Sequence, residues 1–275
     1  MTANPPGFDT LTVTLAAGVA DVQLNRPQSS NAMNEAMWRE IRAAFEWVDA
    51  TPAARVAVLS GAGRHFCAGI DLEMLAWVAR RIAHPDGARS REALRRLILD
   101  LQDCLSAVER CRKPVLAAIH GACVGGALDL VTCCDMRYAA ADAVFSVREI
   151  DLAMVADVGT LQRLPRLVGE GMARELAYTG RNVDAPEAAA LGLVNRVFPG
   201  PAELQAGVAE LALAIAARSP LAVRGIKEVA NYSRDHSVAD GLHFVAAWNA
   251  AMLLSADLDE AVKARREGRR PEFAD

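Results

Sequence analysis

Strand-like and helix-like segments alternate along the first 200 residues, and this alternation restricts the chain to an α/β fold. The run LTVTLAAGVADVQL predicts two strands joined by an Ala-Gly turn. RVAVLS predicts a buried strand, GAGRHFCAGIDL a loop, REALRRLILDLQDCLSAVERC a long helix, and KPVLAAIHG a further strand. A helix is also predicted after the second strand and before RVAVLS. Apolar side chains recur there at helical spacing, at Met33, Met37, Ile41, Phe45 and Val48.

The pattern repeats once more and then changes. GGALDLVTCCDMRYAA predicts a helix and AVFSVRE a strand, while the stretch from GTLQRL to LGLVNRVF predicts short helices with one returning strand. From about Pro201 onward only helical periodicity remains. We therefore expect a core over residues 1–200, followed by a helical region over residues 201–275.

The composition limits the classes of protein to which the chain can belong. With 275 residues and 52% apolar content it can bury a large core, which excludes a disordered or fibrous protein. The net charge is −4 and the basic residues are scattered, so nucleic acid and anionic lipid are not expected partners. MTANPPGFDTLTV lacks the pattern of a signal peptide, and no run approaches the roughly 18 apolar residues of a membrane span. We expect a cytoplasmic protein.

The cysteines indicate neither a disulfide framework nor a metal site. They lie in apolar or helical contexts, without CxxC motifs or the Cys/His spacing of zinc ligands. Buried, reduced thiols are therefore expected at all six positions, which are Cys67, Cys104, Cys111, Cys123, Cys133 and Cys134.

Two glycine-containing loops have the composition of an anion-stabilising site. In HGACVGGALDL the expected strand 115–119 leads into Gly125 and Gly126 just before a helix, where unpaired backbone N–H groups can point at a ligand oxygen. The turn in HFCAGIDL brings a second N–H, that of Ile70, toward the same oxygen. The alternative is that the glycines only permit close packing of helix and strand. Both loops precede a group of acids, and this favours an oxyanion hole.

Three carboxylates, Asp129, Glu149 and Asp157, lie in a stretch that is otherwise apolar and punctuated by glycine. Carboxylates close together in an apolar pocket have raised pKa values, which let a side chain take and give a proton near neutral pH. A single acid is more often a cap or an ion-pair partner. We interpret Asp135 and Asp151 in that way, because each has an arginine nearby in the sequence.

The chain resembles the enoyl-CoA hydratase/isomerase (crotonase) superfamily from near residue 22 almost to its C-terminus, and within it most resembles the Δ3,5-Δ2,4-dienoyl-CoA isomerases. FCAGIDL and the GG-containing helix entry are features of the whole superfamily. Asp129, Glu149 and Asp157 are the more specific part. The segments that resemble it are LNRPQSSNAMNEAMWREI, HFCAGIDLEML, KPVLAAIHGACVGGALDLVTCCDMRYAAADAVFSVREIDLAM, ADVGTLQRLPRLVG, LGLVNRVFP and YSRDHSV.

The resemblance implies a fold and a binding mode. The fold is a spiral core of stacked ββα units containing the acyl-CoA site over residues 1–200, with residues 201–275 covering the site and mediating trimers, often paired into hexamers. The thioester carbonyl accepts hydrogen bonds from the backbone N–H groups of Ile70 and Gly126. The expected CoA-binding residues are Arg26, Arg64, Ala68 and Asp71, although a solvated surface role is equally open for the two arginines.

The resemblance also implies a reaction, the conversion of 3,5-dienoyl-CoA to 2,4-dienoyl-CoA. A proton leaves C2 and one returns at C6, and Glu149 and Asp157 are the pair expected to face the two ends, with the end served by each left open. Asp129 tunes the pKa values of the other two. Hydratases of the superfamily use two glutamates at the positions of residues 129 and 149, so the shorter Asp129 disfavours hydration. No metal or redox cofactor is expected, because backbone donors and carboxylates supply the chemistry.

Other readings of the same chain remain open. They include hydration, single-bond isomerisation, and hydrolytic or dehalogenating chemistry with Asp157 as nucleophile. Superfamily members of the last kind have an aromatic residue in place of Glu149, which favours proton transfer here. A binding protein that has lost the activity is a further alternative, since RNA-binding members exist. The lack of a basic patch interleaved with aromatic residues disfavours it.

Overall fold

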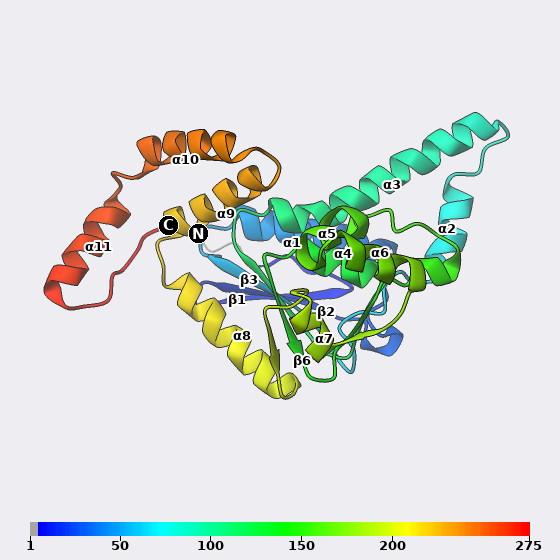
Figure 1. Ribbon diagram of the computed structural model, residues 1–275, viewed down its shortest axis with the longest axis horizontal. Coiled ribbons are helices and arrows are strands. Elements are labelled where there is room, and N and C mark those ends of the chain that lie inside the picture. Colours follow the sequence, from blue (N-terminus) through cyan, green and yellow to red (C-terminus); the bar gives the residue numbers. More distant parts are fainter. Residues whose placement is uncertain (1–4) are drawn as a thin grey trace.

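The computed structural model describes residues 5–275, and its core is built on two β-sheets (Figure 1). The larger sheet has the order β1-β2-β3-β4-β6-β9, in which β1 and β2 are antiparallel and every other neighbouring pair is parallel. Its strands are β1 (Leu11–Ala16), β2 (Val19–Leu24), β3 (Val56–Gly61), β4 (Val115–Ile119), β6 (Met136–Ala140) and β9 (Arg196–Phe198). The smaller sheet, β5-β7-β8, contains β5 (Ala122–Val124), β7 (Val144–Ser146) and β8 (Val183–Asp184).

The central strands are covered on both faces. Every residue of β3 and β4 is buried, as expected for parallel strands whose sequences read as continuous apolar runs. The edge strand β1 instead alternates between more buried and more exposed positions. The expected hairpin at 11–24 and the strands at RVAVLS and KPVLAAIHG are therefore confirmed.

Helices connect the strands and pack around the sheets. The helix expected after the hairpin is confirmed. It begins at Glu35 and is capped by Asn34, whose side chain accepts a hydrogen bond from the Met37 N–H; Met33 lies just before the cap. The long expected helix is α3, which packs against α1. The helices of the core are α1 (Glu35–Ala50), α2 (Glu73–Arg81), α3 (Gly87–Arg110), α4 (Gly126–Thr132), α5 (Thr160–Val168), α6 (Glu170–Thr179) and α7 (Ala185–Ala190), with short 3-10 helices η1 (Pro27–Ser29) and η2 (Glu149–Leu152).

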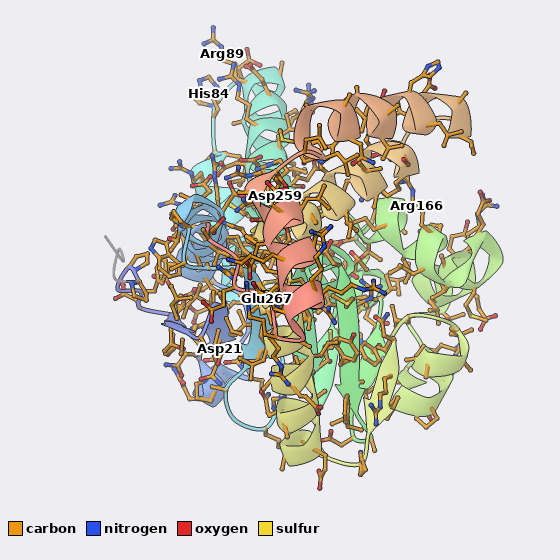
Figure 2. The ribbon with its side chains drawn as sticks, turned by 90° about the vertical axis from the view of Figure 1, so that its left-hand side faces the viewer. Asp21, His84, Arg89, Arg166, Asp259 and Glu267 are labelled. Atoms are coloured by element: carbon orange, nitrogen blue, oxygen red, sulfur yellow. The ribbon has the colours of Figure 1, made fainter. Side chains whose placement is uncertain are left out.

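The remaining regular elements, all after residue 200, are helices, as expected. They form α8 (Pro201–Ala216), α9 (Pro220–Arg234), α10 (Val238–Met252) and α11 (Ala256–Glu267). Helix α8 packs on the larger sheet, so the first of these helices belongs to the core. Helix α10 packs on α9, and α10 and α11 project away from the sheets (Figure 1). From the side, α11 with Asp259 and Glu267 stands in front of the core, and the turn between α2 and α3 near His84 and Arg89 forms a second projection (Figure 2).

Within residues 5–275, no single helix is long and apolar enough to cross a membrane. Helices α8 and α9 pass that test only when taken together, across a bend of 106°. All six cysteines are buried and free, as expected.

The segment GGALDLVTCCDMRYAA departs from its predicted structure. Only its first half is helical, as α4, and MRYAA forms β6, which pairs with β4 and β9. A short apolar run does not distinguish a buried helix from a buried strand by periodicity, and here the pairing with neighbouring strands decides. Two short strands, β5 and β8, were not predicted either, because strands of three and two residues leave almost no periodic signal.

Asn31 connects the loops that lead toward the site. It is fully buried and adopts a left-handed conformation with φ of 55°. Its side-chain Nδ2 lies 2.8, 2.9 and 3.1 Å from the carbonyl oxygens of Ala62, His65 and Phe66, and its Oδ1 accepts a hydrogen bond from the Arg26 N–H. One side chain thus satisfies buried backbone groups from two distant segments.

We expect Asn31→Ala to lower the free energy of unfolding by about 3 kcal/mol, because buried backbone groups lose their partner and alanine is strained at positive φ. Asn31→Gly, which removes the same hydrogen bonds without that strain, should be about 1 kcal/mol less destabilising. Urea unfolding measures both. Variants indistinguishable from the wild type would show that this network does not stabilise the fold.

Candidate active site

The Ile70 N–H is left unpaired by the way its loop meets Met33. The Met33 N–H donates to the Gly69 carbonyl at 2.7 Å, and the Asp71 N–H donates to the Met33 carbonyl at 3.1 Å. A parallel bridge of this kind uses the residues on either side of Ile70, so the N–H of Ile70 itself points away from Met33. No acceptor for it occurs among residues 5–275.

A second N–H without an acceptor among residues 5–275 belongs to Gly126, the first residue of α4, where the helix offers no internal acceptor. Gly125 turns the chain into this helix with φ of 55°, and its N–H donates to the Ser146 carbonyl at 2.9 Å. A Cβ built on Gly69 would lie 3.3 Å from the Gly126 nitrogen, and one built on Gly126 would lie 3.7 Å from the Ile70 nitrogen. The two predicted donors are therefore close neighbours.

These donors open into a cavity of about 560 Å³. Its walls come from the loops after η1 and β3, from the start of α4 and from η2. The predicted residues that line it are Arg26, Ala68, Ile70, Asp71, Gly126 and Glu149. Other lining residues, which were not predicted, include Ser29, Leu72, Arg148, Leu152 and Met154.

The expected CoA-binding arginines differ in their surroundings. Arg26 Nη1 lies 2.9 Å from Asp71 Oδ2 and also donates to the Ala32 carbonyl, so this ion pair connects two loops at the cavity wall. Arg64 is exposed and is not one of the residues that line the cavity. The charge of Arg26 is thus largely balanced by Asp71, and that of Arg64 faces solvent.

Glu149 lies beside the two backbone donors. It begins η2, and a Cβ built on Gly125 would lie 3.5 Å from its Oε1. Burial raises the pKa of Glu149 to about 7, and the negative charges of Asp129 and Asp157 act in the same direction. Glu149 therefore exchanges a proton readily near neutral pH.

Asp129 is a residue of α4 and is fully buried. Its Oδ1 accepts a hydrogen bond of 2.5 Å from the Thr160 N–H at the start of α5. Burial raises the pKa of Asp129, while the hydrogen bonds from Thr160 oppose the shift. Neither Asp129 Oδ2 nor Glu149 Oε2 has a donor in the part of the chain that the structure describes.

Asp157 lies on the segment between η2 and α5 and is the most exposed of the three acids. Partial burial of its carboxyl group raises its pKa, and its charge contributes to the raised pKa values of both Asp129 and Glu149. Its carbonyl accepts a hydrogen bond of 2.6 Å from Gln102 Nε2. The fold thus brings the three predicted acids together, with Glu149 alone of the three in the cavity wall.

The two acids interpreted as ion-pair partners have that role. Asp151 pairs with Arg148 at 3.3 Å, and Asp135 pairs with Lys227 at 2.7 Å. The nearby Arg137 does not pair with Asp135 but donates to backbone carbonyls, among them that of Leu193. Lys227 lies on α9, far away in the sequence, and so proximity along the chain did not identify it.

Three supporting residues were not predicted. Asn31 fixes the loop before the cavity, Thr160 binds Asp129 through its backbone, and Gln102 binds the carbonyl of Asp157. Only Thr160 had a local signal, since it directly follows a glycine at the start of an expected helix. The other two act through contacts between segments that are distant in the sequence.

We expect Glu149→Gln to stabilise the protein, because a carboxyl whose folded pKa exceeds its ordinary value destabilises the fold once it is ionised. The gain should be absent below about pH 4.5 and complete above pH 7, reaching on the order of 2–3 kcal/mol. Urea unfolding from pH 4.5 to 8 measures it, with Glu210→Gln on the exposed face of α8 as control. A gain independent of pH would contradict the raised pKa.

Comparison with known proteins identifies relatives along almost the whole chain. A family model described as enoyl-CoA hydratase/isomerase matches residues 14–275. The peroxisomal Δ3,5-Δ2,4-dienoyl-CoA isomerase of Arabidopsis thaliana is 50% identical over 252 residues, which cover 91% of this chain and 91% of that protein. The mitochondrial Δ3,5-Δ2,4-dienoyl-CoA isomerase of Homo sapiens is 46% identical over 264 residues, which cover 95% of this chain and 80% of that protein.

The fold is shared with solved structures. The crystal structure of an enoyl-CoA hydratase from Bacillus anthracis matches with a TM-score of 0.87 and 32% identity, over 97% of this chain and 99% of that one. The α/β fold with C-terminal helices that the sequence predicted is therefore confirmed.

Proposed function

The chain belongs to the enoyl-CoA hydratase/isomerase family, and we propose that it is a Δ3,5-Δ2,4-dienoyl-CoA isomerase of fatty-acid β-oxidation. The observation that supports this reaction most directly is the group of three acids, Asp129, Glu149 and Asp157, beside two unpaired backbone N–H groups. The relatives from Arabidopsis thaliana and Homo sapiens that bear this name are 50% and 46% identical to the chain.

In the proposed complex the thioester carbonyl oxygen accepts hydrogen bonds from the N–H groups of Ile70 and Gly126. Both donors are fixed by the backbone and need no rearrangement as negative charge develops on that oxygen. One such donor is typically worth about 2.7–4 kcal/mol of transition-state stabilisation. Loss of the C2 proton therefore gives a stabilised dienolate.

Proton transfer is proposed to involve Glu149 and Asp157. One carboxylate takes the proton from C2, the two double bonds shift along the chain, and the other acid delivers a proton to C6. The raised pKa of Glu149, about 7, suits either task. Asp129 accepts a hydrogen bond from the Thr160 N–H, and negative charge on Asp129 raises the pKa of Glu149. The reaction moves protons only, and so the proposal requires no metal or redox cofactor.

The environment of Asp129 disfavours hydration as the main reaction. A second acid that activates water must reach the bound substrate. The Asp129 carboxylate is instead fully buried and bound to the Thr160 N–H, whereas Asp157 is exposed on the segment before α5. Glu149 would then be left without Asp129 as a partner for adding water across C2 and C3.

CoA is proposed to lie along Arg26, Ala68 and Asp71, with Arg64 available to its phosphates. The first three line the cavity next to the backbone donors, and the side chain of Arg64 is free to reorient in solvent. The ion pair of Arg26 with Asp71 would keep the loop shape that holds the thioester.

A homotrimer or hexamer is proposed, with residues 201–275 mediating assembly. One side of helix α10 packs on α9, and the helix exposes apolar residues such as Val238 and Leu242. Leu254, just after the helix, is exposed as well. No residue after Met154 lines the cavity within residues 5–275 of one chain, so covering of the site by these helices requires assembly. Six reduced thiols suit a cytoplasmic location, whereas the two named relatives are peroxisomal and mitochondrial.

Substrate preference tests the proposed reaction. We expect 3,5-dienoyl-CoA to be converted with a rise in the ultraviolet absorbance of the conjugated 2,4-dienoyl thioester, and 2-enoyl-CoA to be hydrated far more slowly. Efficient hydration of 2-enoyl-CoA without conversion of the dienoyl substrate would contradict the proposal. An electrophoretic mobility shift with RNA, combined with no acyl-CoA binding, would instead indicate a binding protein.

Removing each acid in turn distinguishes proton transfer at C2 from proton transfer at C6. We expect Asp157→Asn and Glu149→Gln each to lower kcat by about 10²–10⁴-fold, because each removes one general acid-base group without changing its shape. Exchange of the C2 hydrogen with deuterated water should survive in one variant only, and the variant that loses exchange identifies the C2 base. Glu46→Gln, which removes a surface ion pair with Arg42 on α1, serves as control. Full activity in both variants would rule out a mechanism with two carboxylates.

A further inference from the structure

The segment that bears Asp157 has little hydrogen bonding of its own. It lies between two residues with positive φ, Ala153 at 54° and Gly159 at 136°. Within the described chain, the N–H groups of residues 155–158 make no backbone hydrogen bond, and the carbonyls of these residues accept none from the backbone. A catalytic acid on such a segment needs an external contact to hold its position.

Gln102 provides that contact from a fixed helix. Its Nε2 donates to the Asp157 carbonyl at 2.6 Å across 55 residues of sequence. Helix α3 is held against α1, with Cys104 and Leu105 buried next to Gln102 in the sequence. Three residues beyond Asp157, the Thr160 N–H binds Asp129 on α4. The segment is thus attached to α3 at Asp157 and to α4 at Thr160.

Gln102 is not one of the residues that line the proposed CoA site. Gln102 lines a second cavity, of about 690 Å³, which lies among α3, α5 and α9 and shares no residue with the cavity that contains Ile70, Gly126 and Glu149. Loss of the Gln102 amide therefore leaves the thioester donors and Glu149 in place. It frees only the backbone that carries the Asp157 carboxylate.

We propose that Gln102 is a positioning residue for Asp157, which holds the Asp157 carboxylate at its end of the dienoyl chain. The inference rests on the proposed isomerase function. A displacement of about 1 Å at a reacting group costs on the order of 10²-fold in rate. The effect falls on one proton-transfer step, since acyl-CoA binding uses other residues.

The test compares Gln102→Leu, which keeps the approximate size and removes the donor, with Ser106→Ala one turn further along the same helix. Ser106 lines the second cavity but makes no contact with Asp157. We expect Gln102→Leu to lower kcat about 10- to 100-fold with little change in KM, and Ser106→Ala to lower neither. Gln102→Met, a second change without a donor, should behave like Gln102→Leu, and the urea midpoint of each variant verifies its fold.

A double-mutant cycle distinguishes positioning from a general structural role. In the Asp157→Asn background, Gln102→Leu should have less than about a twofold further effect, because the group that it positions is gone. In the otherwise native enzyme, Gln102→Leu should slow hydrogen exchange at the same substrate carbon as Asp157→Asn, with the other carbon unaffected.

The outcomes separate this inference from the function on which it rests. Multiplicative losses in the double variant, or equal slowing of exchange at both carbons, would overturn the role of Gln102. An active wild type with an equally active Gln102→Leu variant would overturn it as well, and leave the isomerase proposal intact. A wild type that does not convert 3,5-dienoyl-CoA would overturn both.

Discussion

The burial of a carboxylate at Asp129 is the constraint on which the arrangement of the site depends. A charge removed from water needs partners, and Asp129 obtains one from the Thr160 N–H, which fixes where α5 begins. The same charge lies next to Glu149 and helps raise the pKa of Glu149 toward neutrality. One acid outside the cavity wall thus holds the start of one helix and adds to the effect of burial on the pKa of Glu149, which lies in that wall.

The oxyanion donors depend on a different principle, the pairing of backbone groups. Ile70 has a free N–H because Gly69 and Asp71 are both paired with Met33, and Gly126 has one because it begins a helix. Neither donor requires a particular side chain. The two loops can approach each other closely because Gly69 has no side chain, and the buried amide of Asn31 holds the first loop in place. The hydrogen-bond donors of this half of the site therefore depend on the backbone conformation and not on the side chains of Ile70 and Gly126.

Most elements of the fold were predictable, because strands such as β3 and β4 and helices such as α1 and α3 have strong local patterns. The helix predicted through residues 136–140 was wrong, since the pairing of β6 with β4 outweighed the local apolar run. The candidate-site residues that lie in motifs, among them Gly126 and Glu149, were predicted from the sequence, and the fold brings these two to the same cavity. Gln102 and Asn31 were not, because their roles arise only when segments more than 30 residues apart come into contact. Lys227, the partner of Asp135, escaped prediction for the same reason.

Helices α10 and α11 leave the core and then return to it. The chain departs at the end of α9, and its last residues come back, where Arg224 pairs with Asp275 at 2.6 Å and Arg55 donates to the Phe273 carbonyl. The excursion is thus a closed loop anchored at both ends. The entropic cost of closing a loop rises only with the logarithm of its length, by about 0.6 kcal/mol for each doubling. Insertions and deletions in this part of the chain are therefore inexpensive for the core of one subunit, so the length of α10 and α11 is constrained by the proposed assembly rather than by the stability of the sheets.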